Sequence, residues 1–349
     1  MTTKLNFKPL KLLTPPSPRR LIKSWPKVLC FILAIIPLIM LCFVIVNLVV
    51  HTGPVFRQPS YDVNHDGIIN NKDYVGLKGI FSTKISTALT GNKGQYGLIP
   101  AIWGTILLVI VAMGIATPVA LLMAIFSSEF TLGFLGRGMR TLLGVLSGIP
   151  PIIYALMWIV IFTAIIAPNF RPDGLNPPAG MTWWFSPPPN STLIGGIMLS
   201  LLIIPFLAPL FDDAIKNVPN SFKEASLGLG ATRWYTLINV TLPAAFSGLL
   251  SGLRLGVLKA MGDVIIVTAT IAVETNIPNP FFDILRPIAP LTATGVGLAG
   301  GFSQSMIDPL GYAVANVAAI LLVIMAFAII ILETLLQRKF KKRFSHDGR

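Results

Sequence analysis

Long apolar runs alternate along the chain with short stretches that are rich in charged residues, proline and glycine. Six of these runs are each long enough for a helix to cross the roughly 30 Å hydrocarbon layer of a membrane. They cover residues 28–50, 98–126, 141–167, 192–211, 247–272 and 312–336. Helices are expected because lipid offers no hydrogen-bond partner to backbone N–H and C=O groups. The pattern predicts an all-α membrane protein with six transmembrane helices.

The distribution of Lys and Arg predicts which connections face the cytoplasm. With the N-terminus inside, the inner segments are 1–27, 127–140, 212–246 and 337–349; they hold 18 of the 27 basic residues, against seven in the outer loops. Cytoplasmic segments of membrane proteins carry such an excess. We therefore expect basic cytoplasmic tails at both ends of a multi-pass plasma-membrane protein that contacts lipid along its spans. The same sorting explains the net charge of +13, so no nucleic-acid partner is expected.

Three stretches are then predicted to lie outside the membrane. The first, 51–97, is polar, and the second, 167–191, is rich in proline, which excludes a long regular helix. The third, 273–309, is moderately apolar and rich in glycine and proline. Two interpretations of it are open: a segment that dips into the membrane, and a partly buried loop.

The cytoplasmic stretch 212–246 is too polar to lie in lipid. Ser221 is the predicted N-cap of a short helix, because Glu224 follows three residues later at the capping-box spacing. Gly230 then interrupts the helix, and a second amphipathic segment covers Thr232–Val240. Two short helices joined at a glycine fit a docking surface for a partner protein. An ordinary connection between helices fits the pattern as well.

The same stretch contains a spaced set of residues that resembles the EAA signature of ABC importer permeases. It comprises Glu224-Ala225-Ser226, then Gly230, then Val240-Thr241-Leu242-Pro243. Ser stands where the family has a second Ala, and Val stands where it has Ile; both changes are mild. The resemblance covers roughly residues 96–270. It is strongest to phosphate-transport permeases of the PstC type, on Tyr96–Pro100, Ile149-Pro150 and Glu224–Trp234.

The resemblance implies the type I importer permease (MetI-like) fold over residues 98–336. It also implies an ABC ATPase dimer docked on the 212–246 loop, a second permease that is a paralogue, and an extracytoplasmic substrate-binding protein. The implied ATPase-coupling residues are Glu224, Ala225, Gly230, Arg233, Leu242 and Pro243. No G-x-x-x-x-G-K-[ST] sequence for ATP phosphates occurs in the chain. We therefore expect this chain to bind no ATP and to be no enzyme, with hydrolysis on a partner subunit.

Two charged residues of opposite sign, Lys259 and Asp263, lie inside the fifth apolar run. Lys259 is about 18 Å along a helix counted from Ser247. Charges at this depth are expensive, which marks them as substrate-pathway candidates. Their i,i+4 spacing also allows them to pair and simply stabilise packing. The resembling permeases have Arg and Glu here, and Ser where this chain has Pro151, so oxyanion ligands of the family are altered.

Other residues of the fifth run point to helix packing. Gly248, Gly252 and Gly256 form a double G-x-x-x-G stripe, which predicts close contact with another helix. Arg254 has no counterpart in the family pattern, and its role is open.

The first outer loop contains a twelve-residue pattern typical of an EF-hand or dockerin calcium loop. It has oxygen-bearing side chains at positions 1, 3, 5, 9 and 12 and Gly67 at position 6. The predicted Ca²⁺ ligands are Asp62, Asn64, Asp66, the Ile68 carbonyl, Asn70 and Asp73. The alternative is an Asx-rich turn without metal.

Together these features predict the transmembrane permease subunit of an ATP-driven importer for phosphate or a related oxyanion. The alternative, from a different functional class, is a membrane interaction or sensing protein that derives from such a permease and no longer transports. An enzyme is disfavoured because His51, His65 and His346 are dispersed and no nucleophile–base cluster accompanies them.

Overall fold

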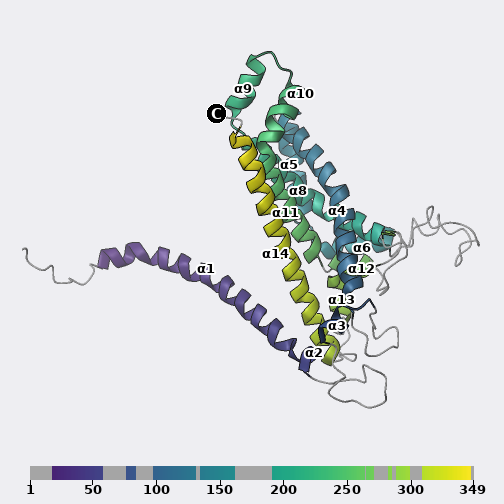
Figure 1. The fold of residues 1–349 in the computed structure, drawn as a ribbon. Helices are drawn as coiled ribbons and strands as arrows, with labels where there is room; N and C mark the ends of the chain where they lie inside the picture. Colours follow the sequence, from purple (N-terminus) through teal and green to yellow (C-terminus); the bar gives the residue numbers. More distant parts are fainter. Residues whose placement is uncertain are drawn as a thin grey trace, which may run out of the picture. The chain divides into compact units, whose positions relative to one another are not determined.

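A computed structural model describes residues 18–57, 76–83, 97–130, 134–161, 191–263, 265–270, 282–284, 288–298 and 309–346. Every regular element among these residues is a helix (Figure 1). The chain divides into two compact units, Met1–Val50 and His51–Arg349. The predicted all-α fold is confirmed.

The first unit contains helix α1 (Pro18–His51), whose last residue belongs to the second unit. Its part from Leu29 to His51 is long and apolar enough to cross a membrane. The helix begins ten residues before the predicted run, since proline is well suited to a first helical position. Cys30 and Cys42 are exposed free thiols on this helix. A helical separation of about 18 Å places them beyond the reach of a disulfide bond.

Four further helices of membrane-spanning length lie in the second unit. They are α4 (Ile99–Ile125), which the π-helical turn η1 (Phe126–Phe130) continues, α8 (Thr192–Lys216), α11 (Leu242–Gly262) and α14 (Pro309–His346). The shorter helices are α2 (Gly53–Arg57), α3 (Gly76–Ile80), α5 (Phe134–Ser147), α6 (Pro151–Ile161), α9 (Asn220–Gly228), α10 (Arg233–Thr236), the π-helical turn η3 (Leu237–Thr241), α12 (Ile265–Thr270) and α13 (Leu291–Leu298). The described residues therefore contain five such spans, or six if the bent pair α5–α6 is one span.

The predicted third span is not a straight helix. Helices α5 and α6 meet at an angle of 88° across a short break. Pro150 and Pro151 lie at this break. Proline lacks an N–H and disfavours the helical conformation of the residue before it, so two successive prolines end α5. The Tyr154 hydroxyl donates to the Leu146 carbonyl at 2.9 Å and so links the two helices across the bend.

Helix α8 forms the centre of the main hydrophobic core, between α4 and α11. The predicted glycine stripe on α11 is confirmed as a packing surface against α8. A Cβ atom on Gly248 would lie 2.8 Å from the Ala214 Cβ, and one on Gly256 would lie 2.9 Å from a Leu207 methyl. Such small residues allow two helices to approach closely where lipid supplies no hydrophobic drive for association.

A second core joins short outer elements to α14. Val55 of α2 and Ile80 of α3 are buried there with residues of α13 and α14. Helix α13 lies within the predicted outer stretch 273–309, and its first residue, Leu291, donates its N–H to Thr105 Oγ1 of α4 at 2.9 Å. Helix α13 is therefore packed into the bundle.

The stripe can be tested with two Gly→Ala substitutions at mid-helix positions. We expect Gly248→Ala to destabilise the protein by about 1–3 kcal/mol, because the new methyl group overpacks the contact with Ala214. Gly114 of α4 is the control, since no atom lies within 4 Å of its added Cβ. Alanine there should be neutral or stabilising. Thermal unfolding of the detergent-solubilised protein measures both, and equal midpoints for the two variants would contradict the packing role.

Candidate functional site

The candidate site begins at a two-helix loop, defined here as Asn220–Thr241 and formed by α9, α10 and η3 (Figure 1). Its two halves meet at Gly230, whose φ of 88° is the left-handed conformation that glycine adopts without strain. Thr232 caps α10 by accepting a hydrogen bond from the Tyr235 N–H at 3.2 Å. The predicted N-cap Ser221 is wrong: Pro219, two residues earlier, is the N-cap of α9, and it makes no side-chain cap hydrogen bond.

The two halves of the loop are tied together and to the bundle. Ser226 Oγ lies 2.9 Å from Thr236 Oγ1, which joins α9 to α10. Lys223 of α9 forms an ion pair with Glu129 of η1. Large apolar side chains of the loop nevertheless face outward: Phe222, Leu227, Leu229, Trp234, Tyr235 and Ile238 are all exposed. Exposed apolar surfaces of this kind occur where a protein contacts another protein or a membrane.

The predicted coupling residues occupy this loop and the start of α11. Glu224, Ala225 and Arg233 are exposed, and neither charged residue forms an ion pair with another described residue. Leu242 and Pro243 are the first residues of α11, which follows α10 and η3 without a break. The second half of the loop is therefore continuous with the base of α11.

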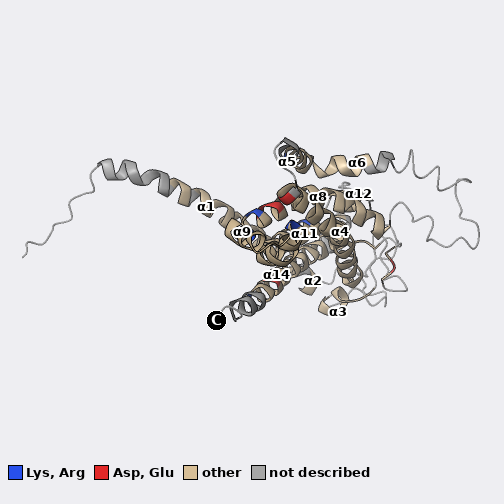
Figure 2. Ribbon diagram, turned by 90° about the horizontal axis from the view of Figure 1, so that it is seen from above, with Lys and Arg blue, Asp and Glu red and all other residues tan. Residues whose placement is uncertain are grey.

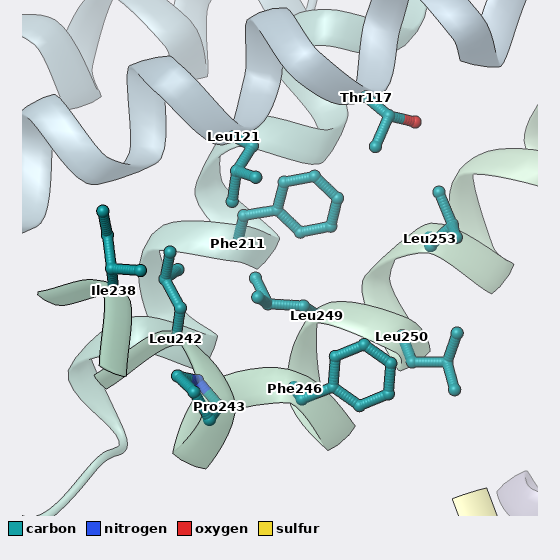
Figure 3. A pocket seen from close by; sticks show the side chains of 10 residues that line it. All are labelled: Thr117, Leu121, Phe211, Ile238, Leu242, Pro243, Phe246, Leu249, Leu250 and Leu253. Carbon is teal, nitrogen blue, oxygen red and sulfur yellow. The ribbon is translucent and has the colours of Figure 1, made fainter. Parts of the chain in front are cut away.

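Beside this base lies an apolar pocket of about 480 Å³. In Figure 3, Phe246 and Leu250 of α11 line one side of it, and Thr117 and Leu121 of α4 line the other. The pocket also contacts Pro243. At this level α11 is therefore separated from α4 by open space.

The predicted continuous fifth span is wrong, since a helix break falls between Lys259 and Ile266, and Lys259 and Asp263 form no ion pair among the described residues. Helix α11 ends at Gly262, and Asp263 has an extended backbone with ψ 111°. The Asp263 carboxylate instead accepts a hydrogen bond from the Ile266 N–H of α12 at 2.9 Å. The Lys259 ammonium lies 4.4 Å from the centre of the Phe206 ring, a cation–π contact. Both charges lie at a helix break, where transport proteins commonly place their binding sites.

Arg254, whose role is open from the sequence, forms an ion pair with a buried acid. Its guanidinium donates to Glu333 Oε2 of α14 at 2.9 Å, and the Glu333 side chain is only 5% exposed. Gln337 completes the cluster by donating to Glu333 and to Ser251 Oγ, the latter at 2.9 Å. The sequence does contain a hint of this pair: Glu333 is the single acidic residue of the last apolar run, and Arg254 is the single arginine of the fifth.

A second charge cluster lies where α8 leaves the bundle. Asp212 is buried and forms ion pairs with Lys216 of the same helix and with Arg140 of α5, at 3.2 Å for Arg140 Nε. Arg140 Nε also lies 3.4 Å from Ser127 Oγ of η1. Arg140 of α5 thus contacts both Asp212 of α8 and Ser127 of η1.

The predicted calcium ligands between Asp62 and Asp73 lie outside the described residues. The short helices before and after that loop, α2 and α3, are described and contact one another.

The model of the family "Binding-protein-dependent transport system inner membrane component" matches residues 116–346. The phosphate transport system permease protein PstC of Haemophilus influenzae is 31% identical over 235 residues, which are 66% of this chain and 75% of that protein. PstC of Xylella fastidiosa (strain 9a5c) is 28% identical over 272 residues, 76% of this chain and 81% of that protein.

Solved structures of ABC importers share the fold. A bacterial ABC transporter involved in the import of the acidic polysaccharide alginate gives a TM-score of 0.59 at 16% identity, with 92% of this chain and 98% of that chain covered. The MetNI methionine ABC transporter gives a TM-score of 0.50 at 20% identity, with 70% of this chain and 95% of that chain covered.

The buried pair Arg254–Glu333 can be tested by comparing single and double replacements. We expect Glu333→Met to destabilise the protein by about 3 kcal/mol, since it leaves a partly buried guanidinium unpaired. The double variant Arg254→Met with Glu333→Met should recover most of that loss, because methionine fills the space without a charge. Thermal unfolding midpoints report the difference. A double variant no more stable than Glu333→Met would show that the pair is not the source of the effect.

Proposed function

The chain belongs to the family of binding-protein-dependent transport system inner membrane components, the permeases of ABC importers, and we propose that it imports phosphate or a related oxyanion. We further propose that a separate ATPase dimer drives it through the two-helix loop. The substrate proposal is supported by the phosphate permeases to which the chain is similar over two thirds or more of its length.

Docking of an ATPase on the loop is supported by the loop's shape and surface. Its apolar side chains are exposed at the end of a bundle that lipid does not cover, and Glu224 and Arg233 present charges beside them. A docked partner would bury both kinds of group. The Gly230 turn and the Ser226–Thr236 contact hold α9 and α10 at one angle, so the loop can act as a rigid lever on α11.

Lys259 and Asp263 are the proposed pathway residues. Lys259 is the cation that an oxyanion would meet near the end of α11, and its contact with Phe206 holds the ammonium in place. Asp263 ties the start of α12 to the same break through Ile266. An ammonium is a point charge without the planar fork of arginine, which suits a less geometrically selective site.

The proposed assembly contains a second permease, a paralogue, and an extracytoplasmic binding protein that delivers the substrate. An alginate transporter of the same fold has been solved with a substrate-bound periplasmic protein. Both termini are proposed to be cytoplasmic, on the sorting of basic residues along the chain.

The outer loop is proposed to bind Ca²⁺ through Asp62, Asn64, Asp66, the Ile68 carbonyl, Asn70 and Asp73. The support is the EF-hand spacing in the sequence. Because α2 and α3 flank the loop and their Val55 and Ile80 are buried in the outer core, calcium would stabilise that core.

Transport is tested by uptake of labelled phosphate in cells that lack the chain and carry one variant of it. Gly230→Ala should lower uptake about tenfold, because a side chain at φ 88° costs about 1–2 kcal/mol. Gly228→Ala is the matched control: it is equally open, two residues away, and has no positive φ. It should transport like the wild type. If the wild-type chain restores no phosphate uptake, the substrate is not phosphate, and a non-transporting sensing role is favoured.

Calcium binding is tested by titration calorimetry on the purified chain. We expect wild type to bind one Ca²⁺ with a dissociation constant on the order of 10⁻⁴ to 10⁻³ M, the range of extracellular sites. Asp62→Ala and Asp73→Ala should abolish the binding heat, whereas His65→Ala, at a position that supplies no ligand, should retain it. Absence of calcium heat in the wild type would refute the site.

A further inference from the structure

The Lys223–Glu129 ion pair is a contact between the two-helix loop and the end of α4. It joins residues that are 94 positions apart in the chain. Both side chains are largely shielded, at 19% and 25% exposure. Helix α9 packs against α10 and η3, and these two side chains link it to η1. A shielded pair is weakened less by salt than one on an open surface.

From η1 the contacts continue to α5 and α8. Ser127, two residues before Glu129, lies 3.4 Å from Arg140 Nε of α5. The same nitrogen lies 3.2 Å from Asp212 Oδ2 of α8. Figure 2 shows acidic and basic residues side by side between the labels α9 and α8. Helix α9 is thus connected through polar groups to η1 and then to α5.

The loop is also connected to the bundle through α10 and η3, which continue into α11. At the base of α11 this second connection does not extend to α4. The apolar pocket of about 480 Å³ separates the base of α11 from Thr117 and Leu121 of α4 (Figure 3). A displacement of that base can therefore take up open space without moving α4. Closer contact between the two helices comes further along, where a Cβ on Gly256 would lie 3.0 Å from Met113 Cε of α4.

We infer that Lys223 and Glu129 form a second coupling contact, which passes displacement of the loop to η1 and, through Ser127 and Arg140, to the bent pair α5–α6. The hydrogen bond from Tyr154 to the Leu146 carbonyl makes α6 follow α5 across the bend. Lys223 and Glu129 are thus positioning residues, since they act on the proposed translocation pathway through the position of α5. This inference rests on the proposed function, since it requires a partner that moves the loop.

The test uses the chain reconstituted with its ATPase, paired permease and binding protein in proteoliposomes, with inorganic phosphate as the probe. The variants are Glu129→Gln, Lys223→Met and the swap Glu129→Lys with Lys223→Glu. Each single variant should lower the phosphate moved per ATP hydrolysed about tenfold, a typical coupling factor, with ATP hydrolysis retained. The swap should recover most of the wild-type ratio. A merely structural role would change folded yield and both rates together.

Asp213→Asn is the matched control, because Asp213 is an exposed carboxylate beside the cluster that forms no ion pair with a described residue. It should keep the wild-type ratio. Single variants with the wild-type ratio, or a swap as poorly coupled as the singles, would overturn the inference.

A second readout separates this inference from the proposed substrate. Spin labels at the exposed residues Leu122 of α4 and Val145 of α5, in a chain with Cys30 and Cys42 replaced, report the distance between the helices. ATP should change this distance in wild type and in the swap, and not in Glu129→Gln. If wild type moves no phosphate while this pattern holds, the substrate proposal fails and the coupling contact stands. If ATP changes the distance equally in Glu129→Gln, the coupling contact fails whatever the substrate is.

Discussion

In the membrane-spanning part of the chain, α8 lies against α4 and α11 at distances that only small residues permit. On the α4 side, a Cβ on Gly196 would lie 2.4 Å from a Val111 methyl; on the α11 side, one on Gly248 would lie 2.8 Å from Ala214. Lipid is as apolar as the helix surfaces, so van der Waals contact between close backbones must hold the helices together. The other elements take their positions from this three-helix core.

Polar groups then connect the core to its surroundings at three levels. Asp212 holds α5 where α8 leaves the bundle, Arg254 holds α14 through Glu333, and Thr105 of α4 holds α13. Each is a directed polar contact between two helices. A single hydrogen bond or ion pair can break, or can transmit a movement, without disturbing its neighbours. A close-packed interface cannot change at one contact alone. This division suits a transporter, in which a packed body must stay intact while its outer helices change angle.

The chain's own residues made much of the architecture predictable. Runs of apolar residues located the spanning helices, and the G-x-x-x-G spacing located the packing face of α11, because both patterns are local. Local patterns failed where a helix stops inside an apolar run. Apolar residues continue on both sides of Pro150 and of Asp263. Composition alone therefore predicted one uninterrupted span at each place, where the backbone in fact turns. Helices α1 and α14 also continue into the predicted tails, since Lys and Arg are good helix formers.

For the candidate site, the sequence by itself determined the loop: its spacing, its glycine turn at Gly230 and its resemblance to importer permeases all come from consecutive residues. Only the tertiary structure decided the partners of the charges. Lys223 meets Glu129 across 94 positions and Arg254 meets Glu333 across 79, and the Lys259 ammonium lies over the ring of Phe206. The physical reason is that a charge which helix packing shields from water is costly without a partner. Each shielded charge therefore takes the partner that packing brings within reach, and chain spacing does not encode that packing.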